Sequence, residues 1–108
     1  MILLFEKFDI TFLLFIYPLC FVTSSAFTVG FAPQKGAQRL LAQSLARDLG
    51  PKGVHVGLFI IDGGVGKDDS NPNKIDPDAI AQTYWDVANQ PKTCWSFETE
   101  VRPALENW

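Results

Sequence analysis

Apolar residues recur at spacings of three and four after residue 36, with arginine and glutamine between them. The apolar positions are Ala37, Leu40, Leu41, Leu45 and Leu49. This period predicts an amphipathic helix with one face towards a core. Pro33 suits the first turn of that helix, and Gly50 followed by Pro51 is expected to end it.

The next segment, Val54 to Ile61, is nearly all apolar and rich in β-branched residues. Such a continuous run predicts a strand that is buried on both faces, as in a parallel sheet. We expect His55, at the start of the strand, to lie at the sheet edge without a chemical role. Asp62 and Gly63 follow the strand, where open α/β sheets bind their ligands, and they are therefore candidate site residues.

A second helix is predicted after a polar loop over residues 66–75. Asp76 is a typical N-cap, Pro77 fits the first helical position, and Pro91 lies beyond the helix end. The expected apolar stripe is Ile80, Ala81, Tyr84, Trp85 and Ala88. Residues 93–101 alternate between apolar and polar, which predicts an edge or half-exposed strand.

The order helix, strand, helix, strand predicts the α/β class with a parallel sheet. Two strands do not complete such a sheet, because a strand like Val54–Ile61 needs neighbours on both edges and helices on both faces. The pattern therefore predicts an incomplete α/β domain over residues 30–108.

Residues 1–29 form a separate hydrophobic segment, whose longest apolar run is Ile10 to Val22. This run is shorter than the roughly 20 residues of a membrane-spanning helix, and Pro18 disfavours a continuous helix. Three interpretations stay open: a signal peptide or anchor over residues 1–26, a strand or helix of a truncated fold, and a stretch unrelated to the rest. The first predicts a secretory or membrane location, and without a signal the location is cytoplasmic.

Composition excludes several classes of function. The chain is 47% hydrophobic and 19% charged, which is typical of a globular protein. Its net charge is −3 without a basic run, so we expect no nucleic-acid partner. Cys20 and Cys94 lie far apart and His55 is the only histidine, so no metal site is expected.

The segment from Gly36 to Val56 resembles the long helix and following strand of the short-chain dehydrogenase/reductase family. The resemblance continues through the second helix to the last strand and covers about residues 30–108. It implies that the fold is a C-terminal fragment of a Rossmann-type parallel sheet. It also implies that the intact parent transfers hydride between NAD or NADP and a carbonyl or alcohol.

The same resemblance assigns residues to the site. Lys35 falls on the lysine that contacts the cofactor ribose and lowers the pKa of the catalytic tyrosine in the family. Phe31 stands at the tyrosine position, and Asp62-Gly63 replaces the usual Pro-Gly of the loop over the nicotinamide. Lys35 alone is therefore a candidate catalytic residue, and Lys35, Asp62 and Gly63 are candidate cofactor contacts. Without a role in catalysis, Lys35 is a solvated lysine and Phe31 a packing residue.

The glycine-rich phosphate-binding turn of the family does not occur in these 108 residues. We therefore expect the chain by itself to bind no cofactor and to be inactive. One alternative is a non-catalytic interaction fragment that forms homo- or hetero-oligomers through the helix 33–50, with Ala37, Leu41 and Leu45 as its apolar face. Another is a secreted or membrane-tethered peptide led by residues 1–26, the one part expected to contact a membrane.

Overall fold

The computed structural model describes residues 2–7, 10–18, 29–67 and 71–105. The elements in chain order are β1 (Ile2–Lys7), β2 (Ile10–Pro18), α1 (Ala32–Leu49), the 3-10 helix η3 (Gly50–Lys52), β3 (Val54–Ile61), β4 (Gly64–Val65), β5 (Lys74–Ile75), α2 (Pro77–Ala88) and β6 (Glu98–Val101). Cys20 and the stretch Ser24 to Ala26 lie outside the described residues.

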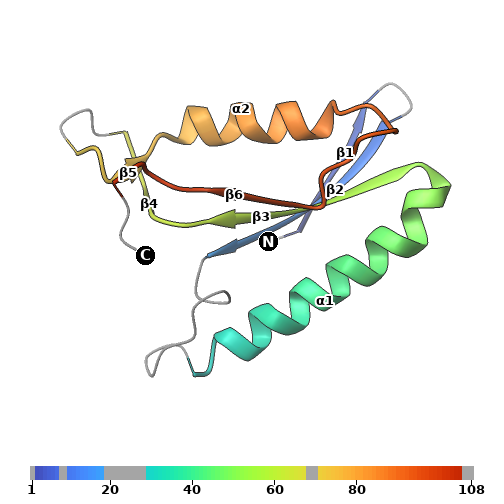
Figure 1. The fold of residues 1–108 in the computed structure, drawn as a ribbon, viewed down its shortest axis with the longest axis horizontal. Coiled ribbons are helices and arrows are strands. Elements are labelled where there is room, and N and C mark those ends of the chain that lie inside the picture. Colours follow the sequence, from blue (N-terminus) through green and yellow to red (C-terminus); the bar gives the residue numbers. More distant parts are fainter. Residues whose placement is uncertain (1, 8–9, 19–28, 68–70, 106–108) are drawn as a thin grey trace.

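In the described part of the chain, the main sheet has four strands in the order β1-β2-β3-β6. β3 pairs in parallel with both β2 and β6, whereas β1 is antiparallel to β2. Figure 1 shows α1 on one side of this sheet and α2 on the other. The prediction of an α/β fragment with a parallel sheet is confirmed, and β3 has the strand neighbours that its apolar sequence requires.

Side chains of β3 form a core on each face of the sheet, as expected for a strand buried on both sides. Val56 and Leu58 pack with Ala42 of α1 on one face. Phe59 packs with Phe12 of β2 and Val87 of α2 on the other. Each fully buried apolar side chain contributes about 1.5–3 kcal/mol to folding, so β3 is the centre of stability.

The core face of α1 differs from the predicted one. Leu45 and Leu49 pack against the core, but Leu40 and Leu41 are 62% and 51% exposed. The helix instead approaches the sheet through Ala42, which is fully buried, and Ala46. Small side chains allow the helix backbone to lie close to Val56 and Leu58, so the leucine spacing alone indicated the wrong face.

The ends of α1 are partly as predicted. Pro33 lies in the first turn, as its fixed φ favours. Gly50 is the C-cap but keeps a right-handed conformation, and the chain continues into η3. The left-handed residue is Gly53, whose φ is 87° and whose amide donates to the Gly50 carbonyl at 2.9 Å.

The helix α2 begins as predicted, since the Asp76 carboxylate accepts from the Asp78 amide at 2.9 Å and Pro77 opens the helix. The predicted apolar stripe is wrong at two positions. Ala81 is exposed and Trp85 is 51% exposed, while Val87 is buried instead. Ile80 is buried, and Tyr84 and Ala88 pack against the Phe59 side of the sheet.

Two loops also differ from the sequence prediction. The polar stretch after β3 contains a small parallel pair, β4 with β5, in the register Gly64↔Lys74. The last strand begins at Glu98 rather than near residue 93, because residues 90–97 form turns that fold over the start of β3.

The N-terminal segment contributes two strands to the main sheet. β2 lies beside β3 in the register Phe12↔His55, and Phe12 is 2% exposed. This is the geometry of a strand within the fold, and the division of the chain at residue 29 stays a prediction. Within the described residues, neither helix is long and apolar enough to cross a membrane.

Candidate functional site

The carboxyl ends of β3 and β6 meet at one edge of the sheet. Ile61 pairs with Val101, and the Asp62 amide donates to the Val101 carbonyl at 2.9 Å. The residues that follow the two strands therefore lie next to each other, with Asp62 after β3 and Arg102 after β6. In open parallel sheets this is the edge where ligands bind.

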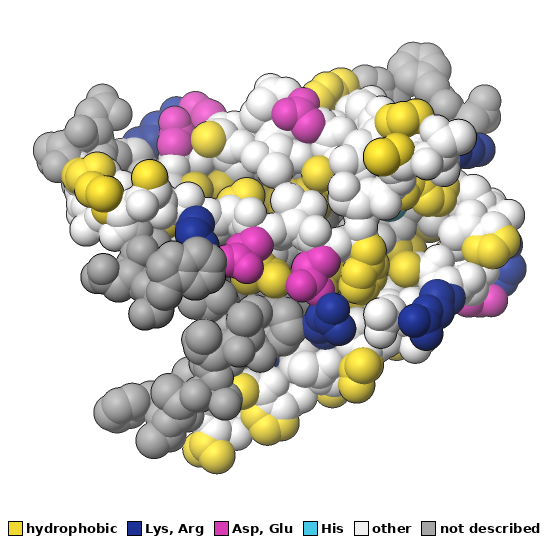
Figure 2. All heavy atoms as spheres, viewed as in Figure 1, with side chains coloured by type: hydrophobic (Ala, Val, Ile, Leu, Met, Phe, Trp, Pro, Cys, Tyr) yellow, Lys and Arg dark blue, Asp and Glu magenta, His cyan; other side chains and the backbone are white. Residues whose placement is uncertain are grey.

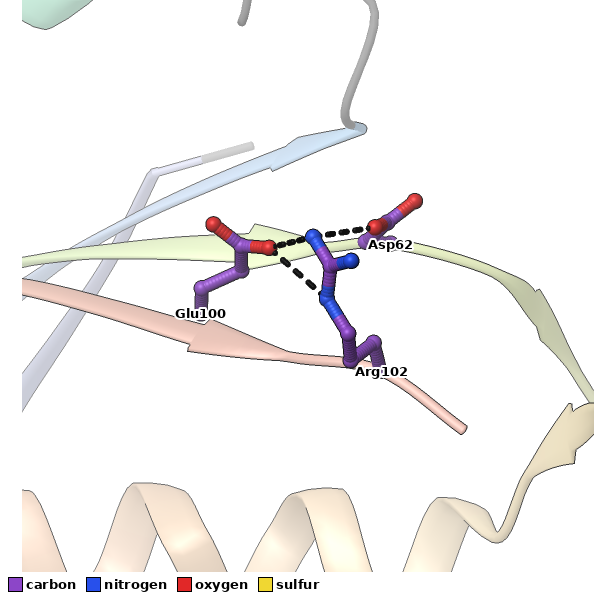
Figure 3. A network of polar contacts seen from close by, with 3 residues as sticks. All are labelled: Asp62, Glu100 and Arg102. Carbon is purple, nitrogen blue, oxygen red and sulfur yellow. Dashed lines mark hydrogen bonds and ion pairs between the residues drawn. The ribbon is translucent and has the colours of Figure 1, made fainter. Parts of the chain in front are cut away.

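A cluster of three charged side chains occupies this edge (Figure 3). The Arg102 Nη2 atom lies 2.7 Å from Oδ2 of Asp62, and Arg102 Nε donates to Oε1 of Glu100 at 3.0 Å. The Asp62 and Arg102 side chains are 5% and 18% exposed. Since the guanidinium bridges two carboxylates, it fastens the end of β3 to the end of β6.

Asp62 and Gly63, the predicted cofactor contacts after β3, also have a local structural role. The Asp62 residue is 4% exposed and its carboxylate is directed towards Arg102. Gly63 has a φ of 143°, a conformation that favours glycine, and it turns the chain from β3 into β4. The assignment of these two residues to a cofactor stays a prediction.

Lys35 and Phe31 lie one helical turn apart at the start of α1, where the Lys35 amide donates to the Phe31 carbonyl at 3.0 Å. Because α1 runs back along the sheet, its first turn and the carboxyl end of β3 lie at the same end of the molecule (Figure 1). Phe31 is 60% exposed, so its ring is not packed into the core of the described residues. The roles of Lys35 and Phe31 stay predictions.

Sequence reasoning missed Arg102 and Glu100. Glu100 is the last polar residue of the alternating stretch 93–101, and Arg102 follows that strand's end. The available signal was the pair of opposite charges, Asp62 and Arg102, directly after two strands expected to be parallel. Pairing the strands in register would have brought these charges together.

A second buried polar group, His55, lies at the opposite end of β3. It is 2% exposed, so the prediction of a sheet-edge position was wrong. Its Nε2 atom lies 2.7 Å from the Ser96 carbonyl oxygen, and its ring stacks on Trp95 with centroids 4.8 Å apart. Desolvation lowers the pKa of His55 below its ordinary value of 6.5, and the hydrogen bond to Ser96 offsets part of this effect.

The described residues do not fit a whole dinucleotide. A pyrophosphate is held by free amides at a helix N-terminus after a glycine-rich turn. At α2 the Asp76 carboxylate already binds an amide, and Asp78 adds a second negative charge. At α1 the first turn contains Pro33, which has no amide hydrogen. The described part also contains no group of three His, Cys, Asp or Glu side chains that could hold a metal ion.

No protein-family model matches the chain, and no curated protein matches it. Among solved structures, the crystal structure of a short-chain dehydrogenase from Rhodopseudomonas palustris is similar, with 36% sequence identity and a TM-score of 0.68. The match covers 83% of this chain and 37% of that one. The chain has a short-chain-dehydrogenase-like fold. Because the match covers 37% of that protein, this chain spans little more than a third of its length.

The extent of the match also bears on the N-terminal segment. A share of 83% of 108 residues is about 90 residues, whereas 30–108 comprises 79. The match therefore reaches into the segment before residue 30, in agreement with the place of β2 beside β3.

Proposed function

We propose that this chain is the C-terminal part of an NAD- or NADP-dependent oxidoreductase. The full-length form would transfer hydride between the nicotinamide and a carbonyl or alcohol. The observation that supports the proposal is the 36% identity to a short-chain dehydrogenase, together with the shared fold over 83% of the chain. Because the chain corresponds to 37% of that protein, the activity belongs to the longer form and not to these residues alone.

Within this proposal, the chain supplies the nicotinamide edge of the site. Lys35 at the start of α1 contacts the cofactor ribose, and the loop after Asp62 and Gly63 lies over the ring. Phe31 has no hydroxyl and cannot act as the general acid or base. Loss of such a group typically costs about 10²–10⁴-fold in rate, so even the full-length form is expected to be slow unless another group supplies the proton.

A chimeric protein tests the proposal. Residues 29–105 of this chain replace the corresponding segment of the Rhodopseudomonas palustris dehydrogenase, and nicotinamide fluorescence reports the binding of NADH and NADPH. We expect saturable binding of one of the two cofactors. Replacing Lys35 by alanine should weaken the binding about 10- to 150-fold, since hydrogen bonds to charged groups contribute roughly 1.5–3 kcal/mol.

The control is Lys52→Ala, which removes an exposed lysine paired with Asp48 at 2.9 Å on the far end of α1. We expect this variant to bind as the unmodified chimera does. In the same background, Phe31→Tyr should raise turnover by about 10²–10⁴-fold. A folded chimera that binds neither cofactor would contradict the proposal, as would equal losses from the two lysine variants.

A second candidate function is an interaction fragment that associates through α1. Figure 2 shows hydrophobic side chains along the outer side of this helix. Leu40 and Leu41 are 62% and 51% exposed. Leu45 packs against the sheet instead, so the available face is formed by Ala37, Leu40 and Leu41.

Sedimentation of the purified chain tests this second function. We expect an oligomer that Leu41→Glu converts to a monomer, because a charge on an apolar interface is costly to bury. Ala81→Glu, which puts the same charge at an exposed apolar position of α2 on the other side of the sheet, is the matched control and should leave the oligomer intact. A monomer of the unmodified chain at high concentration would exclude this function.

A further inference from the structure

The amino end of β3 carries a buried polar network that the proposed oxidoreductase site does not use. His55 projects from β3 into the connection between α2 and β6. In that connection, Gln90 accepts from the Ser96 amide at 2.7 Å and donates to the Ser96 hydroxyl at 2.9 Å. The Trp95 indole donates to the Gln90 carbonyl at 3.2 Å. These bonds fold residues 90–97 into a cover over the imidazole ring.

The hydrogen bond to Ser96 determines the protonation of His55. A backbone carbonyl oxygen only accepts, so Nε2 carries the hydrogen and Nδ1 is the unprotonated nitrogen. Nδ1 is buried and has no hydrogen-bond partner among the described residues. The ring is enclosed by Trp95 on one face and by the edge contact with Phe12, whose centroid lies 4.9 Å away.

We propose that His55 is an acid-sensitive latch: one proton added at its Nδ1 atom releases residues 90–97 from the amino end of β3. The proton creates a charge that no acceptor among the described residues stabilises, in a site closed by two aromatic rings. The least costly response is for the cover to move away, so that water reaches the imidazolium. Unfolding of the whole chain is not required, because only the contacts of Trp95 and Ser96 with His55 must break.

The charges around the ring favour the neutral form. The ring contacts Phe12, Trp95 and Ser96, none of which bears a charge. On α2, Tyr84 stays neutral at these pH values, because burial raises its pKa. In the connection, the residue Lys92 is basic, so it offers no negative charge to an imidazolium. The lowered pKa of His55 agrees with this arrangement and sets the release below pH 6.5.

Release of residues 90–97 from β3 would also loosen β6. The Leu58 amide donates to the Phe97 carbonyl at 2.6 Å, and β6 begins at the next residue, Glu98. After release, the four-residue strand β6 is held to β3 mainly at its carboxyl end, where Arg102 pairs with Asp62. The expected acid form keeps the Asp62–Arg102 contact and loosens the first part of β6.

Nuclear magnetic resonance on the full chain tests the latch directly, because the chain has one histidine and its imidazole signal needs no further assignment. The signal is followed between about pH 8 and pH 5, the range in which histidine titrates. The Trp95 indole signal, assigned with Trp95→Phe, is followed in parallel. We expect His55 to titrate with a midpoint below 6.5 and the Trp95 signal to change with the same midpoint.

The matched variant is His55→Gln, whose side-chain amide can still donate to Ser96 but does not titrate. In this variant the Trp95 signal should not change over the same pH range. If the variant does not fold, the shared midpoint in the unmodified chain decides by itself, because carboxylates titrate near pH 4. A His55 midpoint at or above 6.5, or a Trp95 signal that stays constant while His55 titrates, overturns the proposal.

Discussion

The two ends of β3 hold the last part of the chain in opposite ways. At the amino end a neutral imidazole under aromatic rings bonds to the Ser96 carbonyl. At the carboxyl end the Asp62 carboxylate forms an ion pair with Arg102. Both groups are buried, but one is stable because it is uncharged and the other because its charge is paired. The two ends should therefore respond differently to mutation and to acid.

The largest expected effect is at the carboxyl end. Arg102→Ala removes the guanidinium from the Asp62 carboxylate, whose side chain is 5% exposed, and it should lower the free energy of unfolding by about 3–5 kcal/mol. Urea denaturation measures the loss. The control is Arg39→Ala, which breaks a 2.7 Å pair with Glu98 whose side chains are 33% and 36% exposed and should cost about 0–1 kcal/mol. Similar losses of unfolding free energy in both variants would mean that the buried Asp62–Arg102 pair stabilises the chain no more than the exposed pair does.

An intermediate effect is expected between the two ends, at Gly57. A Cβ atom at this position would lie 2.9 Å from Cζ of Phe12, the ring that also contacts His55. Gly57→Ala should therefore destabilise the chain by about 1–3 kcal/mol through overpacking. Gly36→Ala in α1, which meets no atom within 4 Å, should instead stabilise it by about 0.5–1 kcal/mol. Thermal unfolding measures the stability of both variants. A loss of stability in Gly36→Ala would contradict the prediction.

The smallest effect is the pH dependence of stability from the amino end. Folding lowers the pKa of His55, so below its ordinary value of 6.5 the unfolded chain binds more protons than the folded one. The contribution is complete above pH 6.5 and is lost as the pH falls, by less than about 1.4 kcal/mol for each pH unit. Urea denaturation of the unmodified chain and of His55→Gln at several pH values isolates the contribution of His55 to stability. If the free energy of unfolding changes equally with pH in the two proteins between pH 6.5 and 5, His55 makes no such contribution.

The sequence predicted the positions of the helices and strands better than it predicted which helix faces pack against the sheet. The first-turn proline of α1, the Asp76 cap of α2 and the doubly buried strand β3 depend on local chemistry, and the structure has them where they were expected. The packing face of α1 depends on how closely a helix approaches the sheet. Ala42 decides that distance, and it lies outside the apolar spacing from which the face was predicted.

The same limit explains what was missed at the two ends of β3. His55 is buried because residues 90–97 return over it from 41 positions further along the chain to make the bond at Ser96. The Asp62–Arg102 pair likewise requires the register of β3 with β6. Both contacts are long-range, and hydrophobic periodicity carries information only about neighbours along the chain.

We propose that this chain carries the nicotinamide edge of a cofactor site without the half that holds the phosphates. Titration of the purified chain with NADH and with NADPH, followed by nicotinamide fluorescence, tests that claim most directly. We expect no saturable change in fluorescence with either cofactor up to millimolar concentration. A saturable change in fluorescence that Lys35→Ala abolishes would show that these residues bind the dinucleotide by themselves, and it would contradict the account.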